Sequence, residues 1–152
     1  MPKGEDCGFQ NFISSIDLLV MGRNTYDKVL SFGSWPYEKE VIVMTSCALQ
    51  VPEELKDRII PSTESPIELC DRLSAQGIKK IYVDGGALIQ SFINENLITD
   101  ITITVIPVLI GSGIPLFGSV KNDIEFEHIS TKTYEFGFVQ NKYTIKSQIK
   151  SE

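Results

Sequence analysis

The chain has 152 residues, of which 42% are hydrophobic and 22% are charged, and its formal net charge at pH 7 is -6. This length predicts a single domain over residues 1–152, and the composition is that of a globular protein. The negative charge, without any cluster of Lys and Arg, argues against nucleic acid as a partner. No apolar run reaches the roughly 18 residues of a membrane span, and no export signal opens the chain, so a cytoplasmic location is expected. Three widely spaced cysteines predict neither a disulfide framework nor a metal site.

Short apolar runs alternate with amphipathic stretches in the first part of the chain. Residues 9–15 are expected to form a helix. Residues 18–21 form a continuous apolar run that stops at Gly22, which is typical of a strand buried on both faces. A second helix is predicted over residues 25–30 and a second buried strand over residues 41–44. Strand-helix-strand units of this kind favour parallel pairing.

The next helix has the clearest start signal in the sequence. Ser65 is expected to be its N-cap, Pro66 its first helical residue and Glu68 the partner in a capping box. Gly77 marks its end. After a strand over residues 81–83, the chain passes through Asp84 and a pair of glycines into another helix. That helix is predicted over residues 87–93, because its apolar residues recur with helical spacing.

The last third of the chain is expected to be mostly strand. β-Branched residues alternate with threonines over residues 100–108, and a glycine-rich turn follows at residues 111–113. Two further strands are predicted over residues 125–130 and 138–149, with a turn near Gly137. We expect these C-terminal strands to be an antiparallel edge of a mainly parallel sheet. His128, the only histidine, has no partner in the sequence and is interpreted as structural.

The two glycine-containing junctions between a strand and a helix are the candidate binding sites, because ligands of open α/β sheets bind beyond the carboxyl ends of the strands. At residues 22–25, free backbone amides, a guanidinium and a hydroxyl suit a phosphate group. At Gly85 and Gly86, a ligand can approach the backbone closely. The alternative at each junction is a plain turn requirement. Together the junctions suggest a dinucleotide, although a classical Rossmann motif is absent.

In their order, these motifs resemble the dihydrofolate reductase-like superfamily, in particular the branch similar to the C-terminal reductase domain of riboflavin biosynthesis. The resemblance covers roughly residues 9–146. It is carried by residues 18–26, 43–46, 83–88, 107–113 and 115–117. It implies an α/β three-layer sandwich with a mainly parallel central sheet, helices on both faces and an antiparallel C-terminal edge. It also implies NADPH as the cofactor, bound along the carboxyl edge of the sheet.

The resemblance also implies individual site residues. The implied cofactor-binding residues are Gly22, Arg23, Asn24, Thr25, Ser46, Gly85, Gly86, Ala87 and Leu88. Arg23 would contact the 2′-phosphate or the pyrophosphate, and Ser46 would lie near the adenosine. Asp6 or Glu5 stands near the place where dihydrofolate reductases carry a buried carboxylate, and Asp6 is the candidate catalytic acid. The alternative is that Asp6 is simply an unstructured N-terminal residue.

The chain departs from this family at its beginning. Family members usually open with a strand and a Ser-Leu-Asp-Gly loop, whereas this chain starts almost at the helix that follows them. Either the natural protein lacks the strand or the sequence is a shortened form. The neighbours of such a central strand should then expose apolar faces, which a partner subunit would cover. A homodimer is expected, as is common in the riboflavin-like branch, with residues 101–106 offering a second face.

Two functions follow as hypotheses. The first is an NADPH-dependent oxidoreductase that transfers a hydride to a small heterocyclic substrate, either a pyrimidine like those of riboflavin biosynthesis or a pterin-like molecule. The second is a catalytically degenerate nucleotide-binding or structural protein on the same scaffold. An ordered nicotinamide pocket would favour the first hypothesis.

Overall fold

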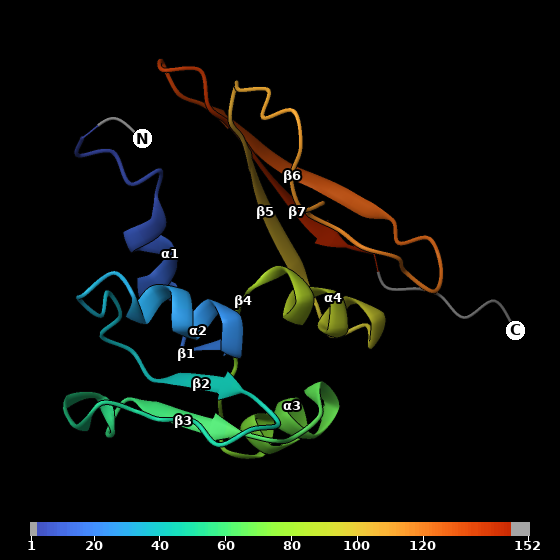
Figure 1. Cartoon of the computed structure of the whole chain (residues 1–152). Helices are drawn as coiled ribbons and strands as arrows, with labels where there is room; N and C mark the ends of the chain where they lie inside the picture. The colour runs from blue at the N-terminus through green and yellow to red at the C-terminus, as the bar shows by residue number, and fades with distance from the viewer. Residues whose placement is uncertain (1–2, 147–152) are drawn as a thin grey trace, which may run out of the picture.

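The structure is a computed structural model that describes residues 3–146, and it contains two sheets and five short helices (Figure 1). The elements, in chain order, are α1 (Phe9–Ser15), β1 (Leu18–Gly22), α2 (Arg23–Leu30), β2 (Val41–Met44), the 3-10 helix η1 (Glu53–Leu55), β3 (Ile59–Ser62), α3 (Pro66–Ala75), β4 (Ile81–Asp84), α4 (Gly86–Asn94), β5 (Asp100–Val105), β6 (Phe126–Thr133) and β7 (Val139–Ile145).

The first sheet is parallel throughout and has the order β3-β2-β1-β4. Its centre is β1, where Leu19 pairs with Val41 of β2 and Val20 pairs with Val83 of β4. Leu19 and Val20 have no exposed surface. Burial of an aliphatic side chain of this size contributes about 1.5–3 kcal/mol to folding, so the continuous apolar run of β1 stabilises the centre of the domain.

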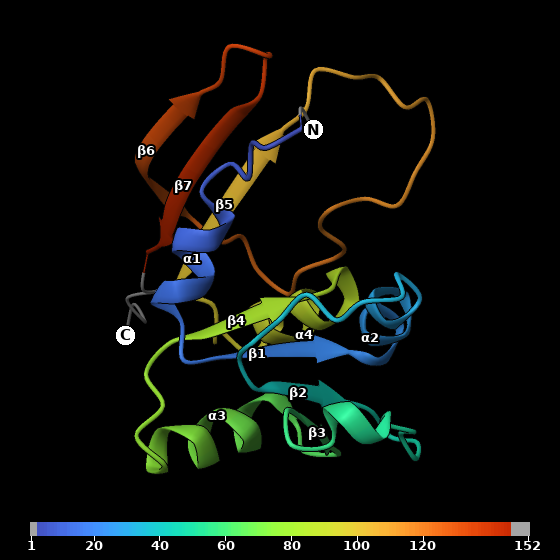
Figure 2. The ribbon, with the colours of Figure 1, turned by 90° about the vertical axis from the view of Figure 1, so that its left-hand side faces the viewer.

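Helices cover both faces of this sheet, because successive side chains of each strand point to opposite sides. On one face, Leu19 and Met21 pack in a cluster with Tyr26 and Val29 of α2. On the other face, a second cluster combines Leu18, Val20 and Ile42 with apolar residues of α3 and α4, namely Leu69, Leu73 and Phe92. Figure 2 shows α3 at the level of β3 and α1 on the side that faces the viewer. This arrangement is the expected three-layer α/β sandwich.

The second sheet is antiparallel and has the order β5-β7-β6. A turn closed by a hydrogen bond from Gly137 N to Tyr134 O joins β6 to β7, and a bulge interrupts their pairing between His128 and Ser130. Most residues of β6 are exposed. The expected antiparallel C-terminal edge is therefore present, but it forms a sheet of its own, because β4 and β5 are not paired with each other in the described residues.

Local sequence signals located most elements closely. The bounds of α1 and β2 are those predicted, and Ser65 and Glu68 form the expected capping box. The strand β3 was not predicted, and β5 ends at Val105 rather than at residue 108. The part of the last predicted strand beyond residue 146 lies outside the described residues. Among residues 3–146, no helix is both long enough and apolar enough to cross a membrane.

Candidate functional site

The two glycine junctions predicted as binding sites lie together at the carboxyl end of the parallel sheet. They adjoin because β1 and β4 are neighbouring strands that run in the same direction. A Cβ on Gly22 would be 3.9 Å from the Cβ of Leu88 on α4, and a Cβ on Gly85 would be 2.5 Å from Oγ1 of Thr25 on α2. The structure therefore brings Gly22, Thr25, Gly85 and Leu88 into one place.

Glycine is required at residue 85 for two reasons. Its φ angle is +102°, a conformation that residues with a Cβ rarely adopt. The 2.5 Å approach to Thr25 Oγ1 also leaves no room for a side chain. The plain turn requirement is thus met at this position.

The two helices that start at these junctions have no side-chain caps. Gly22 is the N-cap of α2 and Gly85 is the N-cap of α4, and neither position makes a side-chain hydrogen bond to the helix. In contrast, α3 has a complete capping box formed by Ser65 and Glu68. The first amides of a helix need acceptors and carry partial positive charge, which is the environment that suits an anion such as a phosphate group, and binding of one at α2 and α4 stays a prediction.

Arg23 connects the first junction to the loop that follows β2. Its Nε donates to both carboxylate oxygens of Asp27, at 3.0 and 2.9 Å, and its Nη1 donates to the carbonyl of Ala48 at 3.3 Å. The Arg23 side chain is 40% exposed, so it can still meet a ligand. Ser46 lies on the same loop and is exposed. The arrangement places Arg23, Asn24 and Ser46 on neighbouring segments, and their cofactor contacts stay a prediction.

Asp84 is a candidate site residue that sequence reasoning did not assign. It is the last residue of β4, directly before Gly85, and it is half-buried. Burial raises the pKa of its carboxyl, although the Gly85 amide and the Tyr82 hydroxyl partly oppose this shift. Burial also raises the pKa of the Tyr82 hydroxyl, with a further contribution from the Asp84 charge. The sequence does contain a signal that could have identified Asp84, because an acidic residue stands there between an apolar strand and a pair of glycines.

Asp6, the predicted catalytic acid, lies before α1 and is exposed. Its carboxylate accepts hydrogen bonds from the amides of Gln10 and Gly8, both at 2.9 Å. These bonds lower the pKa of Asp6. Such contacts are those of a helix cap. The catalytic role of Asp6 stays a prediction, and Asp84 has the more suitable environment for an acid that holds a proton.

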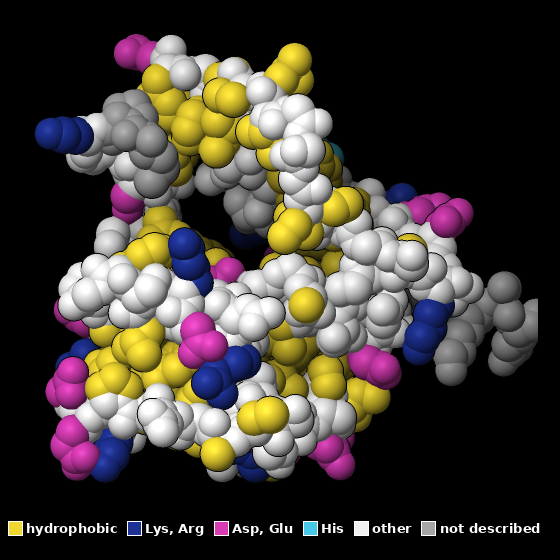
Figure 3. All heavy atoms as spheres, in the orientation of Figure 1, with side chains coloured by type: hydrophobic (Ala, Val, Ile, Leu, Met, Phe, Trp, Pro, Cys, Tyr) yellow, Lys and Arg dark blue, Asp and Glu magenta, His cyan; other side chains and the backbone are white. Residues whose placement is uncertain are grey.

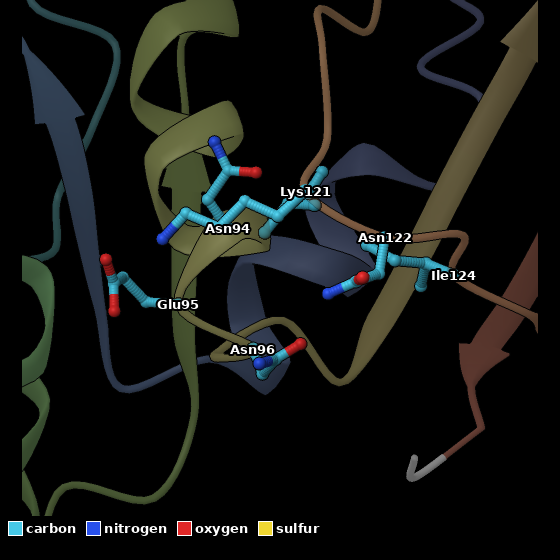
Figure 4. Close-up of a pocket in the computed structure, with 7 residues that line it drawn as sticks. Asn94, Glu95, Asn96, Lys121, Asn122 and Ile124 are labelled. Atoms are coloured by element: carbon cyan, nitrogen blue, oxygen red, sulfur yellow. The ribbon is translucent and has the colours of Figure 1, made fainter.

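Two cavities lie at the other end of α4, away from the glycine junctions. One, of about 280 Å³, is lined by Ile93, Asn94, Glu95, Asn96, Lys121, Asn122 and Ile124 (Figure 4). A more apolar one, of about 340 Å³, adjoins it between α4 and the segment before β6. No predicted cofactor residue lines either cavity. Among the described residues, no group of three or more His, Cys, Asp or Glu side chains is arranged to hold a metal ion.

Comparison with known proteins gives one family. The model of the RibD C-terminal domain matches residues 32–139. The protein named Uncharacterized protein YwjB, from Bacillus subtilis strain 168, is 34% identical over 134 residues, which are 85% of this chain and 74% of that protein. Uncharacterized protein YyaP, from the same strain, is 30% identical over 148 residues, covering 91% of this chain and 79% of that protein.

Solved structures agree with this family. A putative riboflavin biosynthesis protein from Shewanella sp. PV-4 has a TM-score of 0.90 at 37% identity, covering 96% of this chain and 83% of the other. A diaminohydroxyphosphoribosylaminopyrimidine deaminase/5-amino-6-(5-phosphoribosylamino)uracil reductase from Thermotoga maritima has a TM-score of 0.71 at 10% identity, covering 93% of this chain and 48% of the other, which shows the fold alone. With its dihydrofolate reductase-like α/β fold and these matches, the chain belongs to the RibD C-terminal domain family.

Proposed function

We propose that the protein is an NADPH-dependent oxidoreductase that reduces a small heterocyclic substrate, either a pyrimidine of the riboflavin-pathway kind or a pterin-like molecule. The observation that carries the proposal is the contact between the two glycine junctions, where two helices without side-chain caps begin side by side. The amides of these helices would bind the pyrophosphate of the cofactor, because both helix starts favour negative charge.

The residues at the junctions fit a dinucleotide phosphate. Gly85 and Gly86 present backbone without side chains, and Arg23 supplies a half-exposed guanidinium between α2 and the loop after β2. We expect Arg23 to bind the 2′-phosphate, which NADPH has and NADH lacks. Bound NADPH would supply the hydride. The chain itself would orient the cofactor and the substrate and exclude water from the reacting atoms.

Asp84 is the proposed proton donor. Reduction by a hydride also requires a proton at the substrate atom that receives the electron pair. The carboxyl of Asp84 has a raised pKa and stands at the carboxyl end of β4, beside the proposed pyrophosphate site. A carboxyl group that keeps its proton to higher pH is better suited to this role than an exposed one.

The proposed function is tested first by cofactor binding. The full chain would be titrated with NADPH and, separately, with NADH, and binding would be measured by the fluorescence of the nucleotide. We expect micromolar binding of NADPH. Arg23→Ala should weaken NADPH binding at least about tenfold, the loss expected for one charge-assisted contact, and should change NADH binding little. The matched control is Arg58→Ala, which removes an exposed arginine directly before β3 of the same sheet.

The absence of NADPH binding would favour the second candidate, a degenerate nucleotide-binding or structural protein. The observation behind it is the break in the sheet beside β4, the strand that carries Asp84. A domain with an interrupted sheet at the reacting end can keep its fold without an ordered nicotinamide pocket. ATP and AMP are the probes that would separate a nucleotide-binding protein from a purely structural one.

We also propose that the protein forms a homodimer through the segment after β5. Leu109 is fully exposed, at 101% of its reference area, and Ile114 is exposed by 98%. Val108 and Ile110 are also mostly exposed. An apolar surface of this extent is typical of a subunit interface. The surface expected from the sequence, residues 101–106, directly precedes this segment.

A further inference from the structure

The ion pair between Arg23 and Asp27 is not explained by the stability of α2. Arg23 is the first residue of the helix, and Asp27 follows four residues later. A cation there faces the positive end of the helix dipole, and a pair in which the basic residue comes first is the less favourable order. Both side chains are exposed, by 40% and 52%, so the pair contributes little to folding. A local preference that is broken in this way is typical of a functional site.

The carboxylate of Asp27 holds one edge of the Arg23 guanidinium. Both carboxylate oxygens accept from Nε, at 3.0 and 2.9 Å. In the usual two-pronged pair, one oxygen would accept from Nε and the other from an Nη nitrogen. Asp27 therefore leaves the edge formed by Nη1 and Nη2 uncovered. Two parallel N–H groups along such an edge match the spacing of two phosphate oxygens.

A second contact fixes the guanidinium from the side of the loop that follows β2. Nη1 of Arg23 donates to the carbonyl of Ala48 at 3.3 Å. The loop is also held by another residue of α2, because the hydroxyl of the buried Tyr26 donates to the carbonyl of Gln50 at 2.9 Å. Within residues 3–146, Nη2 of Arg23 donates to no acceptor of the protein. The guanidinium is thus held at Nε and Nη1 and remains available at Nη2.

The surroundings of Arg23 suit an anion. The first turn of α2 contains no acidic residue, and its N-cap, Gly22, makes no side-chain hydrogen bond to the helix. Ser46 adds an exposed hydroxyl on the loop after β2. Figure 3 shows basic side chains in dark blue and acidic ones in magenta exposed over α2 and β2, on the face turned to the viewer. Asp27 is the carboxylate that Arg23 contacts in the described part of the chain.

Asp27 has two opposite effects on an anion that binds Arg23. A free arginine side chain samples many rotamers and loses this freedom on binding, so a guanidinium that is already held binds at a smaller cost in entropy. The charge of Asp27, in contrast, partly neutralises Arg23 and repels a phosphate group. Water and salt screen that repulsion at exposed positions. We therefore expect the positioning of Arg23 to outweigh the repulsion.

We propose that Asp27 is a positioning residue that sets the preference of the site for NADPH over NADH. It fixes Arg23 at Nε and directs the Nη edge to the 2′-phosphate, while Asp27 itself contacts no part of the cofactor. The inference rests on the proposed function, because it requires a cofactor with a 2′-phosphate. It goes further in assigning selectivity to an ion pair, so that Arg23 without its partner would discriminate less well.

The test is a double-mutant cycle on the full chain, with the Kd for NADPH and for NADH measured by nucleotide fluorescence. Asp27→Ala should raise the Kd for NADPH about three- to tenfold, the range expected for ordering one long side chain. The Kd for NADH should stay unchanged, because NADH lacks the 2′-phosphate. In the Arg23→Ala background, Asp27→Ala should have no further effect, because Asp27 acts through Arg23. Asp27→Asn keeps an oxygen acceptor for Nε and should restore most of the preference.

Three results would overturn the inference. Tighter NADPH binding by both Asp27→Ala and Asp27→Asn would show that the carboxylate acts through its charge. Equal weakening of NADPH and NADH would indicate a general structural role for Asp27. Additive effects of the Asp27 and Arg23 substitutions would show that Asp27 does not act through Arg23.

Failure of the inference can be distinguished from failure of the proposed function. If the wild-type protein binds no NADPH, or if Arg23→Ala leaves binding unchanged, the proposed cofactor site is wrong and the inference is overturned with it. If NADPH binding depends on Arg23 but not on Asp27, the inference alone is overturned. The matched control is Glu53→Ala, which removes the carboxylate of another exposed ion pair, that with Lys56, and should change neither Kd. Circular dichroism would first establish that all variants fold.

Discussion

The four-stranded and three-stranded sheets differ in how completely each one is buried. In the parallel sheet, Leu19, Val20, Val41 and Val43 have no exposed surface, and helices pack on both faces. Among residues 3–146, every fully buried hydrophobic side chain lies at or before Ile93. The antiparallel sheet and the segments around it contribute none. The first region therefore forms its own core, whereas the second region exposes apolar surface that suits contacts with other molecules.

This difference explains why the candidate site lies where it does. The glycine junctions belong to the parallel sheet, so their positions are fixed by fully packed strands and helices. Asp84 lies at the border, on the strand whose other edge is unpaired. Fully packed strands and helices beneath the glycine junctions suit a site that holds a ligand in a fixed place.

The largest effect is expected from Asp84→Asn at this border. The substitution keeps the shape of the side chain but removes the acid, so kcat/KM should fall by about 10²- to 10⁴-fold while the Kd for NADPH stays nearly constant. The substrates to be measured are 5-amino-6-(5-phosphoribosylamino)uracil and dihydrofolate. Asp71→Asn, an exposed carboxyl on α3, is the matched control.

The pH dependence gives a second check on Asp84. Because burial raises its pKa, the carboxyl keeps its proton to a higher pH than an exposed Asp. The protonated fraction falls as pH rises through the raised pKa, so wild-type kcat/KM should fall in the same interval and the Asn variant should not show this fall. An unchanged profile in the variant would exclude Asp84 as the proton donor.

Gly85→Ala should destabilise the parallel sheet and the helices packed on it. The positive φ and the 2.5 Å approach to Thr25 Oγ1 both oppose a Cβ, so the free energy of unfolding should fall by about 2–5 kcal/mol. Gly86→Ala is the control, because nothing lies within 4 Å of its added Cβ. Gly86→Ala should leave stability unchanged or slightly higher, and it should still weaken NADPH binding. Chemical denaturation measures the two variants, and equal stability would contradict the described close approach.

Leu109→Glu changes the region around the antiparallel sheet, and we expect it to have the smallest effect on stability of these substitutions. The side chain is fully exposed, so the free energy of unfolding should change by less than about 0.5 kcal/mol at monomer concentrations. Light scattering should show the wild-type protein at twice its mass of 17.0 kDa and the variant at that mass. Ile67→Glu, on α3, is the control with an exposed apolar residue in the packed region. A monomeric wild type would contradict the proposed dimer.

Local sequence signals predicted the packed region better than the open one. The apolar run of β1 and the capping box of α3 depend on neighbouring residues, so they are readable in the sequence. The division into two sheets depends on which strands pair across the chain, and no local pattern in residues 81–84 or 100–105 contains that information. β3 was missed because Pro61 falls inside a short strand, and proline argues against a strand in the sequence.

The candidate site was predicted in part. The glycine junctions followed from their positions after apolar strands, but their mutual contact appeared only in the structure. Asp84 was not assigned a role, since its raised pKa arises from burial, which a single sequence does not give. Asp6 was selected by its position near the first helix, where its carboxylate in fact accepts two backbone hydrogen bonds.

The most direct test of the central claim is a nuclear magnetic resonance titration of isotope-labelled protein with NADPH. The account predicts that the largest amide shifts belong to Gly22, Arg23, Gly85 and Gly86, the residues at the starts of α2 and α4. Shifts that cluster instead around Asn94 and Lys121, in the cavity at the other end of α4, would contradict it.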